Sequence, residues 1–158
     1  MKGIRVLNMA KIGIIGAGSW GIALSVLLHN NGHTVTVWSA LEKEIEMLNR
    51  EHEQKEKLPG VKLPDDMCFT SDLQQAMDEK DILVLAVPSS FTRSTAHLMK
   101  AYAAQNQIIV NVAKGIEEAT LMTLSQVIED EIPQVDVAVL AGPSHAEEVG
   151  RGIPTTIV

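Results

Sequence analysis

The 158-residue sequence has little of what disulfide-rich, metal-binding or nucleic-acid-binding proteins depend on. Its single cysteine, Cys68, excludes a disulfide framework and any metal site built from several cysteines. Acidic residues (20) outnumber basic ones (13), and the net charge of −7 disfavours non-specific nucleic-acid binding. No apolar run approaches the ~20 residues of a membrane span. Most of the histidines are scattered without ligand spacing, so we predict no metal site.

The first 16 residues form a short basic lead into an apolar stretch that glycines soon interrupt. They contain no signal-peptide cleavage pattern, so we expect a cytoplasmic protein. Met1 and Met9 are both candidates for the natural start.

Short β-branched runs alternate with longer amphipathic runs along the chain. Near-continuous apolar strands indicate a parallel sheet that helices cover on both faces. The predicted fold is therefore α/β: one doubly wound, Rossmann-like sheet in three α/β/α layers, filling residues 1–158 as one domain. Because the last strand stops after four residues, we expect the chain to be cut from a longer one. Strands are expected at 11–15, 34–38, 68–70, 82–87, 108–112, 135–140 and 155–158, and helices at 19–31, 41–53, 72–79, 89–104, 119–131 and from about 144.

The segment Gly16 to Gly21 reads G-A-G-S-W-G, a G-x-G-x-x-G between a predicted strand and a predicted helix. We expect Gly16 to allow a tight turn, Gly18 to let a pyrophosphate approach the backbone, and Gly21 to let helix and strand pack closely. The phosphates would lie on the free N–H groups and the positive dipole end of the helix. A glycine-rich turn without a ligand is the alternative, and the entropy that three glycines cost argues against it.

The second predicted strand lacks the acidic residue that commonly binds a ribose 2′-hydroxyl. Ser39 and Ala40 occupy that place, and the nearest acids, Glu42 and Glu44, fall inside the next helix. Without the acid, no negative charge repels a 2′-phosphate. Ser39 would donate a hydrogen bond to such a phosphate. Lys43 would add positive charge, or it is a solvated helix residue. The pattern thus favours NADP, or use of both NAD and NADP.

Three loops follow core strands at the edge where open α/β sheets bind ligands, namely 87–91, 111–117 and 141–148. Lys114 offers a compact cation to a hydroxyl or phosphate, or is an exposed loop lysine. Gly142 to Ser144 offer N–H groups and a hydroxyl, or form a simple turn and helix cap. His145 beside two glutamates is more typical of a structural or solvated histidine than of a metal ligand or an acid–base group. Cys68 is expected to be a small core residue.

Six segments together resemble NAD(P)-dependent glycerol-3-phosphate dehydrogenases of the bacterial type. They recur in order across nearly the whole chain, followed by Pro154-Thr155, and KGIE with GPSHAEEV is far more specific than the glycine motif alone. The segments are IGAGSWGIAL (15–24), NGHTVTVW (31–38), LPGVKLP (58–64), VPS (87–89), KGIE (114–117) and GPSHAEEV (142–149).

The resemblance implies a role for individual residues. Lys114 would touch both cofactor and glycerol phosphate and orient the substrate, and Gly142 and Ser144 would contact the substrate. Ala40 stands where relatives often carry Arg or His, and Pro88 and Phe91 would line the nicotinamide side. Motif and resemblance together predict these cofactor-binding residues: Gly16, Gly18, Ser19, Trp20, Gly21, Ser39, Ala40, Pro88, Phe91, Lys114 and Ala146.

The resemblance further implies an oxidoreductase that interconverts sn-glycerol 3-phosphate and dihydroxyacetone phosphate and feeds phospholipid synthesis. Its general base would be a lysine of an all-helical C-terminal domain outside this chain, so we expect these residues alone to be inactive. Whether the full-length protein is a monomer or a homodimer stays open. The alternatives are the cofactor domain of another two-domain hydroxyacid or ketopantoate-type reductase and a non-catalytic dinucleotide-sensing module.

Overall fold

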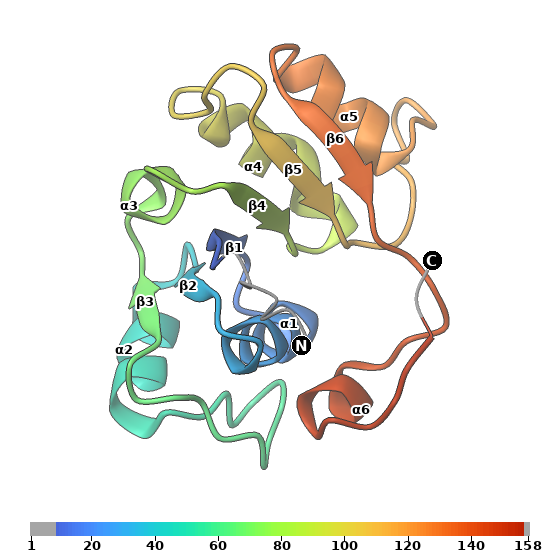
Figure 1. Ribbon diagram of the computed structural model, residues 1–158. Coiled ribbons are helices and arrows are strands. Elements are labelled where there is room, and N and C mark those ends of the chain that lie inside the picture. Colours follow the sequence, from blue (N-terminus) through green and yellow to red (C-terminus); the bar gives the residue numbers. More distant parts are fainter. Residues whose placement is uncertain (1–8, 157–158) are drawn as a thin grey trace, which may run out of the picture.

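The computed structural model describes residues 9–156, which fold around one six-stranded parallel sheet (Figure 1). The strand order is β3-β2-β1-β4-β5-β6, so the chain builds the sheet outward in one direction and then reverses to build the other half. This arrangement confirms the predicted doubly wound α/β fold. The strands are β1 (Lys11–Ile15), β2 (Thr34–Trp38), β3 (Cys68–Thr70), β4 (Ile82–Leu85), β5 (Ile108–Asn111) and β6 (Asp136–Val139).

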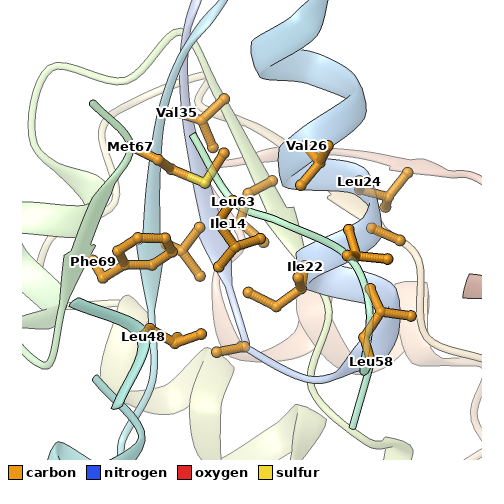
Figure 2. Packing of buried hydrophobic residues seen from close by; sticks show 14 of the residues in the cluster. Ile14, Ile22, Leu24, Val26, Val35, Leu48, Leu58, Leu63, Met67 and Phe69 are labelled. Atoms are coloured by element: carbon orange, nitrogen blue, oxygen red, sulfur yellow. The ribbon is translucent and has the colours of Figure 1, made fainter. Parts of the chain in front are cut away.

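Helices cover both faces of the sheet and complete the three layers. One face packs against the first two helices, the last helix and the loop 58–67. Figure 2 shows how side chains of the first two helices and of this loop pack on the strands. The other face packs against the third, fourth and fifth helices. The helices are α1 (Ser19–Asn30), α2 (Glu42–Glu51), α3 (Leu73–Met77), α4 (Thr92–Met99), α5 (Leu124–Glu131) and α6 (Ala146–Gly150), with a 3-10 turn at Ser89–Phe91.

Two helices begin where side chains cap them. Asp72 accepts hydrogen bonds from the backbone N–H groups of Gln74 and Gln75, which confirms the predicted start of α3. Thr123 and Gln126 form a reciprocal capping box at α5. The predicted start of that helix at residue 119 is therefore wrong by several residues: the chain first makes a turn closed by a bridge between Ile116 and Thr123.

Three further expectations need correction. The helix predicted over 89–104 is a 3-10 turn followed by α4, which ends at Met99. Cys68 is exposed, because it opens the short edge strand β3 and its side chain points away from the core. Residues 155–156 have no regular structure, and the rest of the strand predicted there, 157–158, lies outside the described residues, as does the N-terminal lead 1–8. Within the described part of the chain, no helix is long and apolar enough to cross a membrane.

Gly13, in the middle of β1, lets α3 pack directly on the sheet. A Cβ there would lie 2.3 Å from the backbone oxygen of Ala76 and 2.8 Å from a methyl carbon of Leu83. Gly13→Ala is therefore expected to destabilise the fold by about 1–3 kcal/mol, the usual cost of overpacking. Urea unfolding measures the effect.

Gly18→Ser is the matched control for this test, because a side chain at Gly18 meets no atom within 4 Å. If Gly13→Ala unfolded at the same urea concentration as this control, the close packing of α3 on β1 would be wrong.

Candidate functional site

A cleft crosses the carboxyl ends of β1 and β4, at the point where the strand order reverses. It consists of two hollows of about 420 and 520 Å³. Both hollows are lined by Gly18, Ser19 and the segment 86–88, so they meet above the glycine turn. The first continues toward the loops after β5 and β6, and the second continues toward the end of β2.

The three glycines of the turn have three different surroundings. Gly16 has φ +125°, a conformation that favours glycine, and its amide donates to the Trp38 carbonyl oxygen at 2.9 Å. A Cβ on Gly21 would lie 2.0 Å from the Gly16 carbonyl oxygen. Gly18, by contrast, has an ordinary φ of −70° and nothing within 4 Å of the position of a Cβ. The fold therefore requires the first and third glycines, whereas the second leaves open space in the cleft.

The N-terminus of α1 faces this open space. Gly18 is its N-cap, no side chain caps it, and its first turn holds no acidic residue. The first N–H groups of a helix have no partner inside the helix, and the helix dipole makes that end positive. The end of α1 is thus suited to hold an anion such as a pyrophosphate.

The loops after β5 and β6 meet at Lys114. Its Nζ donates to the carbonyl oxygen of Ser144 at 3.3 Å. The side chain of Asn111, which is buried at the end of β5, bonds the backbone of Ala113 and sets the direction of the loop. The first hollow is therefore lined by the Lys114 cation and the buried Ser144 and Ala146, with the Glu147 carboxylate also in its lining.

Arg93 of α4 holds the loop that carries Lys114, through hydrogen bonds to Glu117 of that loop. Its Nε and Nη2 donate to the two carboxylate oxygens of Glu117 at 2.7 and 2.8 Å, and Nη1 donates to Asp130 and Glu131 of α5, each at 2.7 Å. The guanidinium, with the Thr120 hydroxyl, lowers the pKa of Glu117 from 4.5 to about 2. A fork of this kind fixes both position and orientation. The Lys114 loop is thereby tied to two helices.

A second polar cluster closes the far end of the cleft. The Glu44 carboxylate accepts hydrogen bonds from Ser39 Oγ at 2.6 Å and from Gln54 Nε2 at 2.7 Å, and it pairs with Lys57 Nζ. Gln54 is fully buried and also donates to the Ala17 carbonyl oxygen at 3.1 Å. The cluster therefore connects the end of β2 with the glycine turn.

The structure brings most of the predicted site residues together in this cleft. Phe91 lines the second hollow with Ser39 and Ala40, away from Lys114. Gly142 lies outside both linings, in a turn with φ +145°. Of the predicted residues, those that line the first hollow alone are Trp20, Lys114, Ser144 and Ala146. Those that line the second alone are Gly16, Ser39, Ala40 and Phe91, and Gly18, Ser19 and Pro88 line both.

Sequence reasoning missed several residues of the site. The sequence pattern places Glu44 inside a helix and gives it no role, but the first turn of α2 directs its side chain back to the end of β2. Lys57, rather than the exposed Lys43, reaches the second hollow, together with the exposed side chains of Leu41 and Leu98. In residues 9–156, no three His, Cys, Asp or Glu side chains are grouped so that they could hold a metal ion.

Comparisons of the chain with known proteins, by sequence and by structure, point to the same family. Residues 11–158 match the family described as NAD-dependent glycerol-3-phosphate dehydrogenase N-terminus. A glycerol-3-phosphate dehydrogenase [NAD(P)+] of Agathobacter rectalis is 64% identical over 150 residues, and one of Fusobacterium nucleatum is 56% identical over 152 residues. Each alignment covers 95% of this chain and 45% of the relative.

A solved structure extends the likeness to three dimensions. The glycerol-3-phosphate dehydrogenase of Coxiella burnetii superposes with a TM-score of 0.88 at 30% identity. The match covers 94% of this chain and 46% of that one. The chain thus spans about half the length of the relatives it matches.

The Arg93 anchor predicts a specific pH dependence of stability. Because the pKa of Glu117 is lower in the folded chain than its ordinary value of 4.5, the unfolded chain binds more protons as the pH falls. The stabilisation is complete above about pH 4.5 and is lost toward about pH 2. Arg93→Met should therefore lower the melting temperature most above about pH 5, and the gap to wild type should shrink below it.

The exposed Lys43 offers a control with the same loss of charge. Melting curves of Lys43→Met should stay at a constant, small offset from wild type over this range. An equal gap between Arg93→Met and wild type at pH 7 and pH 3 would contradict the anchoring role.

Proposed function

The chain belongs to the NAD-dependent glycerol-3-phosphate dehydrogenase N-terminal family, and from this premise we propose that it is the NAD(P)-binding domain of such an enzyme. The full-length protein would interconvert sn-glycerol 3-phosphate and dihydroxyacetone phosphate. Residues 11–158 would supply the cofactor site, and the second half that the relatives possess would complete the substrate site.

The empty space at Gly18 is the observation that carries this proposal. The fold itself accounts for Gly16 and Gly21, but no packing contact accounts for a glycine at position 18. A pyrophosphate lying on the uncapped end of α1 would need that space, because any side chain would stand between it and the backbone.

The two hollows suit the two halves of a dinucleotide. The pyrophosphate would cross at Gly18 and Ser19, with the adenosine half in the second hollow beside Ser39 and Ala40. The nicotinamide half would occupy the first hollow, near Trp20 and Ala146. Pro88, which lines both hollows, would line the passage between the halves. Phe91 lines the second hollow, so it would lie nearer the adenosine half than the family resemblance implies.

Substrate would enter the first hollow opposite the nicotinamide. The bound cofactor supplies the hydride for the carbonyl carbon. Lys114 would orient the substrate oxygen or its phosphate by a charge-assisted hydrogen bond, and Ser144 would offer a hydroxyl. The contact of Gly142 with substrate rests on the family resemblance alone, since Gly142 lies outside both linings. By the family resemblance, the general base is a lysine of the second half.

Two alternatives receive less support. Another two-domain reductase would share the cofactor domain, but the glycerol-3-phosphate dehydrogenase family matches this chain over residues 11–158. A dinucleotide sensor would have no use for the anchored Lys114 loop. We place the activity in the cytoplasm, where nicotinamide cofactors are supplied, and in phospholipid precursor synthesis.

Two glycine variants separate binding from folding. Gly18→Ser is expected to keep the melting temperature, because serine is a good N-cap and meets no atom, while weakening NAD(P)H binding at least about tenfold by filling the phosphate space. Gly21→Ala is expected to lower the melting temperature, because its Cβ would collide with the Gly16 oxygen.

Fluorescence titration with NADH and NADPH, beside thermal melts, makes both measurements. Unchanged cofactor affinity in a folded Gly18→Ser protein would refute the proposed phosphate site, as would a wild type that binds neither cofactor.

Lys114→Met tests the substrate side in the full-length protein. The variant should lose about 10–100-fold in kcat/KM for dihydroxyacetone phosphate, the range of a charge-assisted hydrogen bond. Its affinity for NAD(P)H should change much less. Steady-state kinetics with Lys43→Met as the matched control measures this, and wild-type kcat/KM in Lys114→Met would remove Lys114 from the site. The 158 residues alone should show no turnover.

A further inference from the structure

The end of β2 carries no acid of its own, yet a carboxylate lies there. Glu44, in the first turn of α2, accepts the hydrogen bond of Ser39 Oγ at the very end of the strand. This is the place where many dinucleotide-binding sheets hold an acid against the adenosine ribose. We propose that Glu44 and Lys57 form an opposed pair that sets the choice between NADH and NADPH; the inference rests on the proposed function and deepens it.

Glu44 is held in one position. Its side chain is 10% exposed, and three groups from two segments contact it: Ser39 Oγ after β2, and Gln54 Nε2 and Lys57 Nζ from the loop after α2. Gln54 is itself fixed, because its Nε2 also bonds the Ala17 carbonyl oxygen inside the glycine turn. The Glu44 carboxylate is therefore held at a fixed place relative to both the end of β2 and the glycine turn.

Glu44 and Lys57 both line the second hollow, so both face the position of the adenosine ribose. The carboxylate can accept a hydrogen bond from a 2′-hydroxyl, which favours NADH, and it repels a 2′-phosphate. The Lys57 side chain is 41% exposed and is free to turn from Glu44 toward a 2′-phosphate, which favours NADPH.

In this arrangement the Ser39 hydroxyl does not donate a hydrogen bond to a 2′-phosphate. Its hydroxyl hydrogen is donated to Glu44, and its oxygen accepts from the Leu41 amide at 3.1 Å. Discrimination at the 2′ position therefore depends on the balance between one anion and one cation. With both present, neither cofactor is strongly excluded.

Removal of each charge should shift that balance in opposite directions. Glu44→Gln keeps one oxygen acceptor, for either Gln54 or Ser39, and removes the charge. It should raise the ratio Kd(NADH)/Kd(NADPH) about tenfold over wild type. Lys57→Met keeps the apolar stem and should lower the same ratio about tenfold. Both shifts should shrink at high salt, the Lys57 shift more than the Glu44 shift, because the Lys57 side chain is 41% exposed and that of Glu44 only 10%.

The experiment is a fluorescence titration of the 158-residue chain with NADH and with NADPH at low and high salt. Glu46→Gln and Lys43→Met are matched controls, because they remove the same charges at exposed positions of α2 and should leave the ratio unchanged. Thermal melts check that each variant folds. If Glu44→Gln does not fold, Lys57→Met decides alone.

The possible results distinguish a failure of the proposed function from a failure of the specificity role of Glu44 and Lys57. If wild type binds neither cofactor, the proposed function fails and the inference with it. If wild type binds, and both variants weaken NADH and NADPH equally, then the cluster only supports the glycine turn and the specificity role is overturned while the proposed function stands. Shifts in opposite directions that diminish with salt support the inference.

Discussion

The close approach of α1 to β1 is the constraint on which the cleft depends. The helix can begin directly above the strand only because Gly21 has no side chain to strike the Gly16 carbonyl oxygen, 2.0 Å from where a Cβ would be. That contact directs the uncapped end of α1 toward the reversal point between β1 and β4. The two hollows lie on either side of Gly18, because β2 and β4 pair with opposite edges of β1.

Side chains far apart in the sequence hold the two ends of the cleft. At one end, Gln54 and Glu44 connect the glycine turn to the end of β2. At the other, Arg93 holds Glu117 and so fixes the loop that carries Lys114. Each anchor is a bonded carboxylate, which restricts direction as well as distance. The backbone thus forms the cleft, and these polar clusters fix the positions of its two ends.

Local patterns in the sequence were sufficient for the fold and for the backbone part of the site. Short apolar runs between amphipathic ones predicted all six observed strands, and the glycine spacing predicted the turn. The start of α5 was misplaced because the capping pair Thr123 and Gln126 was overlooked. Glu44 with Lys57, by contrast, depends on how a loop returns to a helix thirteen residues earlier, which no local period encodes. Cys68 was misjudged because burial on an edge strand depends on what covers it.

Charge explains why the two ends of the cleft differ. The chain carries a net charge of −7, so an anionic ligand must be held by local groups, chiefly the N–H groups and dipole at the start of α1. Lys57 at one end faces a carboxylate, which largely cancels its charge. Lys114 at the other end contacts a neutral carbonyl oxygen, and in residues 9–156 it forms no ion pair with a carboxylate. An additional phosphate is therefore better accommodated beside Lys114 than beside Lys57.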